Sequence, residues 1–519
     1  MLPRRRTVSL AVLLAVLSAA IYSAAFPPLS LGALAWVALV PLLIAAASAS
    51  VPTAAVLGLV WGITLALGVG WPLPGMIRNF TGASALSSWL VLLAVGLGLT
   101  GIYSAAFTAW VAWLVERGGA SPLAIAAGWT ACELARSRLL VGNPWALVAY
   151  SQLGATRLVQ LADATGPYGI GFVVAAVNAT LAGVLVPALA GRRPAVSRLA
   201  AAAVVAGALG YGEWRLADGT LGGGESLRVA VVQGAIERGL RSAPQESARN
   251  LDRYVELSRA AARSNPQIVF WPEFAVDFYL QESSVERDAL LAVDRELSTD
   301  LILGGPHYVA GPPRVRYHNS VFLVSRGEVA DRYDKLRLVP IAERNALGWL
   351  VRGRANAYEP GRAAYPLRAA GVRVGAFVCF ESMYPELVRR FAIAGAEVLA
   401  NLSNDDWFGA AAPARLALDM ASLRAIENRR YLVRAATTGY SAIIDPFGRR
   451  VATTELGAPG VLSATIHPSR AATPYQRWGD LFAWLAVGWA LGASAVRYGT
   501  YTTEARRETT RQRNERREP

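Results

Sequence analysis

Three reactive side-chain types occur in short and distinctive sequence contexts: a thiol, a carboxylate and an ammonium. Cys379 lies in the run VGAFVCFE, Glu273 in VFWPEF and Lys335 in YDKLRLVP. Each follows a segment rich in β-forming residues. Together they are the groups needed for a thiolate nucleophile, a base beside it and a cation that holds an oxyanion.

Each of these residues also has a plainer interpretation when it is taken alone. Cys379 would be a small buried apolar residue, Glu273 a solvated loop acid and Lys335 a surface lysine. The context favours chemistry, because a helix begins near Tyr384 and a strand-to-helix turn would project the thiol where helix amides favour a thiolate. Burial after Trp271 and Pro272 would raise the pKa of Glu273 towards that of a useful base. Three histidines occur, and none stands in a recognisable nucleophile-base signature: His307, His318 and His467.

The region from 225 to 468 has the mixed charge of a globular domain and alternates between β and α patterns. We expect strands at 226–234, 267–273, 300–309, 372–380 and 397–404, a hairpin at 318–335, and two last strands within 440–454. We expect helices at 243–265, 283–297, 385–394 and 414–430. Strands repeatedly followed by helices predict a layered α/β domain.

The first 215 residues are dominated by Ala, Leu, Val, Gly and Trp, which is typical of a membrane domain. After the basic start MLPRRR, which resembles a retained signal peptide, apolar runs of near spanning length predict seven helices. Those that follow the first lie at 31–48, 52–72, 86–115, 121–137, 166–190 and 196–214. Residues 478–498 predict an eighth helix, and 499–519 a basic cytoplasmic tail that is disordered.

The charge of +14 comes from arginines that cluster at the ends of the apolar runs, which indicates membrane topology and not nucleic-acid binding. With a cytoplasmic N-terminus, the alternation of loops predicts that domain 225–468 lies outside the cytoplasm and that the tail lies inside. Only two cysteines occur, Cys132 and Cys379, so no disulfide framework is expected and Cys379 is predicted to be a free thiol.

The motifs FWPEF, YDKLRLVP followed by Glu343, and VCFES together resemble the Glu-Lys-Cys triad motifs of the carbon-nitrogen hydrolase (nitrilase) superfamily. With the apolar spans before and after this region, the whole chain resembles the apolipoprotein N-acyltransferase family. This resemblance implies an α-β-β-α sandwich. It also implies that Glu273 is the general base, Lys335 the oxyanion stabiliser and Cys379 the nucleophile, with Glu343 and Glu381 as supporting carboxylates.

The resemblance further implies acyl transfer in two steps at a bacterial inner membrane, on its extracytoplasmic side. A phospholipid donates the acyl chain to Cys379, and the N-terminal diacylglyceryl-cysteine of an apolipoprotein accepts it. We expect no metal, no organic cofactor and a monomer. Phe380 and Trp407 are expected to contact substrate, and Trp349 and Leu350 to form a lipid-contacting lid, for which core packing is the alternative.

The sequence departs from the family pattern at several positions near the site. Phe380 stands where tyrosine is usual, Ala235 and Thr437 or Thr438 where asparagine is usual, and the stretch 410–418 is rich in alanine. Two alternative functions remain. A membrane-tethered amidase would use the same three residues with water as the second nucleophile. One membrane anchor would suffice for such an enzyme, whereas eight spans are predicted here. A non-catalytic scaffold or transporter would be expected to lose a triad residue or to carry charges deep in its spans.

Overall fold

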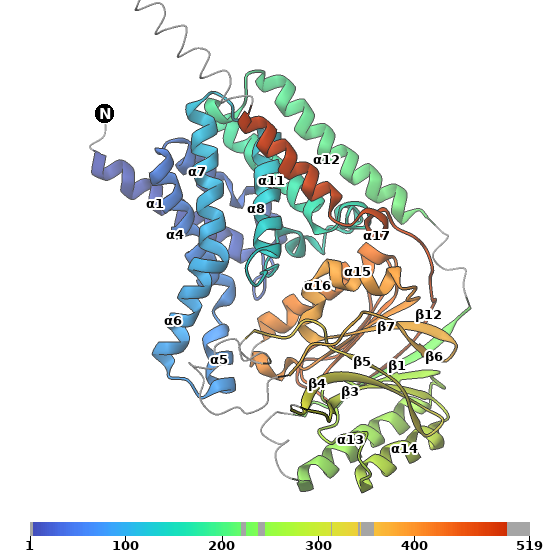
Figure 1. Ribbon diagram of the computed structural model, residues 1–519. Coiled ribbons are helices and arrows are strands. Elements are labelled where there is room, and N and C mark those ends of the chain that lie inside the picture. The colour runs from blue at the N-terminus through green and yellow to red at the C-terminus, as the bar shows by residue number, and fades with distance from the viewer. Residues whose placement is uncertain are drawn as a thin grey trace, which may run out of the picture.

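The computed structural model describes residues 4–218, 225–236, 244–312, 314–340, 343, 358–409 and 411–495. These form a bundle of apolar helices above a globular part built from two β-sheets (Figure 1). The predicted lid residues Trp349 and Leu350 and the predicted tail at 499–519 lie outside the described residues.

Two six-stranded sheets lie face to face in the globular part. The first contains, in spatial order, β12 (Gly460–Ile466), β1 (Leu227–Gln233), β2 (Ile268–Phe270), β3 (Asp300–Val309), β4 (Arg316–Ser325) and β5 (Glu328–Asp334). The second contains β11 (Arg450–Thr453), β10 (Ala442–Ile444), β9 (Leu432–Ala436), β8 (Val398–Ser403), β7 (Val372–Val378) and β6 (Leu367–Ala369). In both, the inner strands run parallel: β1, β2 and β3 in one, and β7, β8 and β9 in the other.

Helices cover the outer face of each sheet, and the predicted α-β-β-α sandwich is therefore confirmed (Figure 1). The first sheet carries α13 (Pro244–Ala262) and α14 (Val285–Leu297), and the second carries α15 (Pro385–Ile393) and α16 (Ala411–Asn428). Strands such as β8 are buried along their whole length because both faces of their sheet are covered.

Among the described residues, four helices are long and apolar enough to cross a membrane by length and composition. They are α4 (Val51–Gly70), the continuous helix Ala85–Glu116, α11 (Pro167–Leu185) and α12 (Pro194–Leu216), and shorter apolar helices occupy Val8–Ala24, Gly32–Ala47 and Leu481–Ala495. The predicted span 31–48 is broken before α3 (Val40–Ala47), whose second residue is a proline that donates no backbone hydrogen bond. The predicted span 121–137 is α8 (Pro122–Arg138), which ends in two arginines. A membrane-type helical region is thus present, and its count of eight spans stays a prediction.

The helical and globular parts share one apolar core. Met383, Leu387 and Leu423, from the 3₁₀ helix η7 (Cys379–Met383) and from helices α15 and α16, belong to the same buried cluster as residues of α1 (Arg4–Ala24), α8 and α11. A separate buried cluster fills the space between the two sheets. Helices α15 and α16 therefore pack on the second sheet with one side and on the membrane-type helices with the other.

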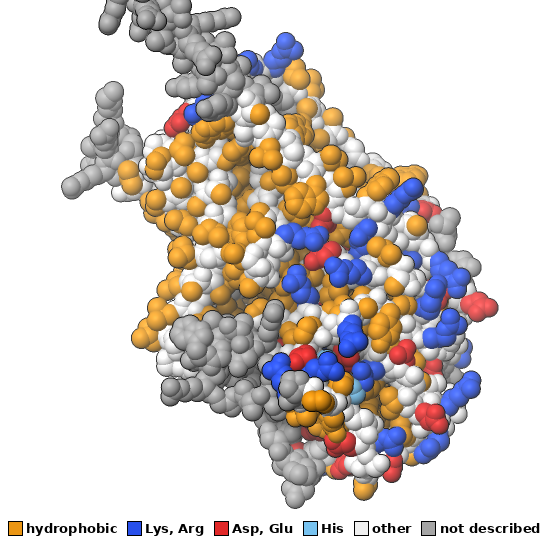
Figure 2. Space-filling view, in the orientation of Figure 1, with side chains coloured by type: hydrophobic (Ala, Val, Ile, Leu, Met, Phe, Trp, Pro, Cys, Tyr) orange, Lys and Arg blue, Asp and Glu red, His pale blue; other side chains and the backbone are white. Residues whose placement is uncertain are grey.

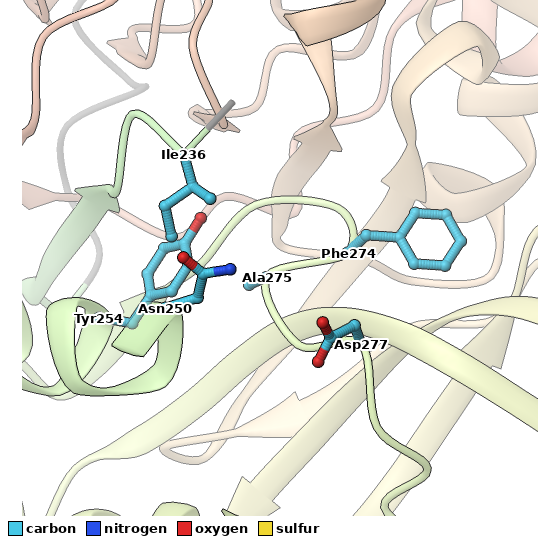
Figure 3. Close-up of a pocket in the computed structure, with 6 residues that line it drawn as sticks. All are labelled: Ile236, Asn250, Tyr254, Phe274, Ala275 and Asp277. Carbon is cyan, nitrogen blue, oxygen red and sulfur yellow. The ribbon is translucent and has the colours of Figure 1, made fainter. Parts of the chain in front are cut away.

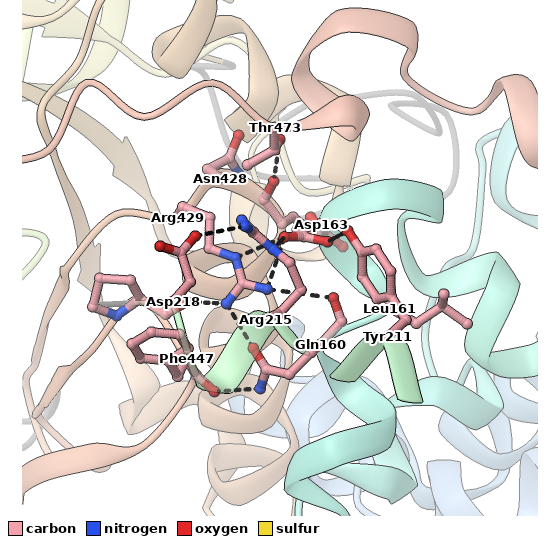
Figure 4. Close-up of polar contacts among 12 residues, drawn as sticks. Gln160, Leu161, Asp163, Tyr211, Arg215, Asp218, Asn428, Arg429, Phe447 and Thr473 are labelled. Atoms are coloured by element: carbon pink, nitrogen blue, oxygen red, sulfur yellow. Dashed lines mark hydrogen bonds and ion pairs between the residues drawn. The ribbon is translucent and has the colours of Figure 1, made fainter. Parts of the chain in front are cut away.

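A buried ionic network joins the two parts on a second side (Figure 4). Asp163 of α10 (Ala162–Thr165) accepts hydrogen bonds from the Arg429 Nε at 2.8 Å, the Arg215 Nε at 2.7 Å and the Tyr211 hydroxyl at 2.5 Å. Asp163 and Arg429 have no exposed surface. Because Arg429 directly follows α16 while Tyr211 and Arg215 belong to α12, the carboxylate connects the globular domain to a candidate membrane helix.

Candidate active site

Cys379 lies directly after β7, where the chain turns sharply into the 3₁₀ helix η7 (Cys379–Met383). Its φ is +48°, a left-handed conformation that a residue other than glycine rarely adopts. Such strain persists where the surrounding structure enforces it, and it is frequent at functional sites. The turn leaves Cys379 partly buried, and the cysteine is a free thiol, as predicted.

Glu273 follows β2 and is 3% exposed. Its Oε1 accepts hydrogen bonds from the Asn319 Nδ2 at 2.7 Å and from the Lys335 Nζ at 3.2 Å. Its Oε2 accepts one from the backbone N–H of Asn404 at 2.7 Å, just after β8. The carboxylate is therefore held from three sides, which fixes its orientation.

Lys335 follows β5 and is 1% exposed, so the surface-lysine interpretation is excluded. Its Nζ donates to Glu273 and, at 2.9 Å, to the Oε1 of Glu343. Burial lowers the pKa of Lys335, but the charges of Glu273 and Glu343, with a smaller effect of Cys379, outweigh burial and raise it. The ammonium stays charged across the physiological pH range.

The Cys379 thiol is electrostatically coupled to both residues. Burial raises its pKa, the negative charge of Glu273 raises it further, and the positive charge of Lys335 lowers it. A stable thiolate is consequently disfavoured at neutral pH, so a nucleophile at this position needs a base that accepts the proton as the sulfur attacks. The structure brings together the three residues that the sequence singled out.

Glu381 is fully buried and joins the strand that leads to Lys335 with the strand that leads to Cys379. Its Oε1 accepts from the backbone N–H of Leu336 at 2.7 Å and of Arg337 at 3.0 Å. Its Oε2 accepts from the backbone N–H of Val378 at 2.7 Å, and the Tyr333 hydroxyl donates to both oxygens. This carboxylate therefore sets the distance between the β5 and β7 ends.

Glu343 completes the carboxylate set at the lysine. Its Oε1 accepts from Lys335 and from the Asn319 Nδ2 at 2.8 Å, and its Oε2 accepts from the backbone N–H of Val339 at 2.7 Å. Asn319 thus bridges Glu273 and Glu343 through one amide nitrogen. Sequence reasoning missed Asn319 because it lies inside β4, where a polar residue looks like an ordinary strand position.

The two predicted substrate-contacting residues within the described chain lie on turns that follow neighbouring strands. Phe380 is partly buried, and its ring packs against that of Tyr384 with centroids 5.3 Å apart. Trp407 is partly buried in η8 (Asp405–Phe408), next to the Asn404 amide that holds Glu273. Whether these rings contact substrate stays a prediction.

A small pocket lies on the other side of the Glu273 loop, lined by Ile236, Asn250, Tyr254, Phe274, Ala275 and Asp277 (Figure 3). The Phe274 ring points away from Asn250 and Tyr254 (Figure 3). Neither Lys335 nor Cys379 lines this pocket, so it is separate from the reactive cluster.

Comparisons with known proteins cover both parts of the chain. Residues 18–180 match the family model of the apolipoprotein N-acyltransferase N-terminal domain, and residues 228–475 match that of carbon-nitrogen hydrolase. The apolipoprotein N-acyltransferase of Geobacter metallireducens is 32% identical over 505 residues, which are 94% of this chain and 95% of the relative. That of Methylococcus capsulatus is 31% identical over 506 residues, again 94% and 95% of the two chains.

Among solved structures, a carbon-nitrogen hydrolase from Helicobacter pylori matches with a TM-score of 0.38 and 18% identity, covering 50% of this chain and 94% of that chain. The full-length relatives match the helical and the globular parts in a single alignment. With that coverage and identity, the chain belongs to the apolipoprotein N-acyltransferase family.

Proposed function

We propose that this protein transfers an acyl chain from a phospholipid to the N-terminal amine of a diacylated apolipoprotein, the last step of lipoprotein maturation. Its curated relatives carry the name apolipoprotein N-acyltransferase. The observation that supports the chemistry best is the buried contact of 3.2 Å between Glu273 and Lys335, both coupled to the Cys379 thiol. A buried acid-ammonium pair beside a protonated thiol suits acyl transfer through a thioester.

In the first step Glu273 accepts the Cys379 proton while the sulfur attacks the ester carbonyl of the phospholipid. Lys335 and backbone amides stabilise the tetrahedral oxyanion. The carbon-oxygen bond then breaks, and the lysophospholipid leaves with the proton from Glu273. A thioester remains on Cys379.

In the second step the α-amine of the diacylglyceryl-cysteine attacks the thioester, and Glu273 accepts the amine proton. The amide forms, the carbon-sulfur bond breaks, and the proton returns to the Cys379 thiolate. Every step uses groups that belong to the chain or to the two substrates, so the proposal needs no metal or organic cofactor.

For the membrane arrangement we propose eight spans, seven within residues 1–215 and one at 478–498, in a bacterial inner membrane. The catalytic domain 225–468 would lie on the extracytoplasmic side, residues 499–519 in the cytoplasm, and the protein would act as a monomer. The apolar helices and the basic clusters at their ends support this arrangement. Both substrates carry acyl chains whose transfer to water costs about 0.8 kcal/mol per CH₂, so the reaction belongs at the bilayer surface.

The test is to incubate the purified protein in phospholipid-detergent micelles and to look for an acyl adduct on Cys379 by mass spectrometry. We expect a hydroxylamine-labile adduct that persists in water and disappears when a diacylated lipopeptide is added. Cys379→Ala should form no adduct, and Glu273→Gln should form it far more slowly. Hydrolysis of small amides without any phospholipid adduct would instead favour the tethered amidase.

A further inference from the structure

Arg337 lies two residues beyond Lys335 on the same loop. Its backbone N–H donates to the Glu381 Oε1 at 3.0 Å, beside the bond from Leu336. The Glu381 carboxylate, which joins the ends of β5 and β7, therefore also fixes the backbone from which the Arg337 side chain extends. A cation is thus held at a defined position next to the reactive cluster.

The Arg337 guanidinium is held in one orientation by Tyr384, while its N–H groups remain available to bind a ligand. Its Cζ lies 4.4 Å from the centre of the Tyr384 ring, a cation-π contact that holds the plane of the group. Within the described residues its one ion contact is a long one of 3.9 Å to Glu386, and no hydrogen bond engages its side-chain nitrogens. With the side chain 44% exposed, the N–H groups can bind an anion from solution or from a lipid surface.

Tyr384 contacts the Arg337 guanidinium, the residue that follows Cys379 and the end of an exposed apolar segment. Its ring packs on Phe380, the neighbour of Cys379. Its hydroxyl donates to the carbonyl of Gly142 at 3.3 Å. Just before Gly142, Leu139, Leu140 and Val141 are 57%, 71% and 49% exposed. The contacts of Tyr384 therefore bring the Arg337 guanidinium near both the residue that follows the thiol and this apolar segment.

Arg337 belongs to a small group of charged side chains and has the weaker ion contact of the two arginines in it. Glu386 lies between Arg337 and Arg138, each at 3.9 Å, and Arg138 has its closer partner in Asp480. Asp480 thus compensates Arg138, and the long contact with Glu386 is the ion contact that remains for Arg337 among the described residues. Figure 2 shows Lys and Arg side chains, with Asp and Glu among them, where the mostly apolar helical part meets the globular part and over the globular part itself. Guanidinium groups recognise phosphate through paired N–H donors.

We propose that Arg337 binds the phosphodiester of the phospholipid donor while the ester carbonyl lies at Cys379 and the acyl chains lie along Leu139 to Val141. This inference rests on the proposed function and adds a headgroup site to it. Arg337 is a substrate-binding residue here, with no role in proton transfer.

The test measures single-turnover acylation of Cys379 by mass spectrometry, with full-length protein in micelles and limiting donor. One arm uses a phospholipid, and the other uses the 4-nitrophenyl ester of the same fatty acid, which offers the carbonyl without a phosphate. For Arg337→Gln we expect about a tenfold or greater fall in the phospholipid rate, since hydrogen bonds to a charged group are lost. The nitrophenyl ester rate should stay within about twofold of wild type, and Arg337→Lys should restore part of the phospholipid rate.

The matched control is Arg259→Gln, which removes an exposed arginine paired with Glu296 on the far helices α13 and α14. It should leave both rates unchanged. Equal slowing of both donors by Arg337→Gln would overturn the phosphate site, because it would mean a distorted reaction centre. Unchanged phospholipid acylation would overturn it too. A wild-type protein that takes no acyl group from phospholipid would contradict the proposed function itself.

Discussion

At the scale of single residues, the site is organised around the two oxygens of Glu273. One oxygen faces Lys335 and Asn319, and the other faces the backbone N–H of Asn404. A carboxylate with both oxygens occupied keeps its position when the proton from Cys379 arrives. Asn319, like Lys335, donates hydrogen bonds to both this carboxylate and Glu343.

Asn319→Ala should therefore impair chemistry more than stability. Without the bridging amide, the carboxylates of Glu273 and Glu343 repel each other across Lys335, and Glu273 loses its orientation. We expect the rate of Cys379 acylation to fall by about ten- to a hundredfold, in line with the loss of a buried hydrogen bond to charged groups. A rate within about twofold of wild type in a protein with a normal melting temperature would contradict the bridging role of Asn319.

The pH dependence of the thiol separates the effects of its two charged neighbours. Burial and then the Glu273 charge raise the Cys379 pKa, while the Lys335 charge lowers it. Glu273→Gln removes a charge that raises the pKa of Cys379. Alkylation of Cys379 by iodoacetamide should therefore begin at lower pH in this variant than in wild type. Lys335→Met removes the charge that lowers the pKa of Cys379, so the pH profile of alkylation should shift to higher pH. Peptide mapping distinguishes Cys379 from Cys132, and two variants shifting in the same direction would refute this assignment.

At the scale of elements, the reactive groups all stand where strands end. Glu273 follows β2, Lys335 follows β5, Cys379 follows β7 and the Asn404 amide follows β8. These strands belong to two different sheets, and Glu381 joins the end of β5 in one with the end of β7 in the other. The sandwich thus positions groups that are far apart in the sequence.

Glu381 accepts hydrogen bonds at the ends of both β5 and β7, so replacing it should destabilise both strand ends. Glu381→Gln replaces one oxygen with an NH₂ group that faces backbone donors, so at least one buried N–H loses its partner, at about 1–3 kcal/mol each. We expect a lower melting temperature and slower acylation together. Tyr333→Phe removes one hydroxyl donor and leaves the three backbone bonds, so its melting temperature should fall less. The reverse order would contradict the bracing role of Glu381.

Local sequence patterns were sufficient to predict most of the strands and helices of the globular part. The apolar runs ending in Glu273 and Cys379 predicted β2 and β7, and the motif order predicted which side chains meet. The patterns did not predict β6, β9 or β12. The three residues of β6 are too few to show a period, and β12 is recognisable only through its pairing with β1 from the other end of the domain. Asn404 acts through its backbone N–H, which leaves no signature in residue type.

At the scale of the whole molecule, the globular part is not independent of the helices. The outward sides of α15 and α16 lie in the core of the helical part, and Asp163 pairs with both Arg215 and Arg429 at the junction. Contacts of this kind are encoded by residues far apart in the sequence, and for that reason the sequence predicted the two parts but not their junction.

Asp163→Asn should destabilise the protein by about 3–5 kcal/mol, because the fully buried guanidinium of Arg429 loses its counter-charge. Asp218→Asn is the matched control. Asp218 pairs with the same Arg215 at 2.8 Å but is 23% exposed, so its loss should cost less than about 1 kcal/mol. Thermal unfolding of both variants in the same detergent checks the order, and equal melting temperatures would refute the importance of the junction.

Expression of residues 225–468 alone tests the shared core. Without the helical part, the apolar side of α16 would face water, and exposed apolar patches of that kind cause aggregation. We expect the isolated domain to be insoluble without detergent, and a stable, soluble monomer would contradict this view.

The pairing of β1 with β12 has a consequence for how such a chain could arise. Leu227, the first residue of β1, is the direct partner of Ile466, the last residue of β12. The chain therefore enters and leaves the sandwich at neighbouring points, although nearly the whole domain lies between them. In the order of the chain, the sandwich is a single long insertion between the apolar helix α12 and the apolar helix Leu481–Ala495. A gene encoding such a domain can be inserted into a helical hairpin, or exchanged for a relative, without altering the order of the helices around it.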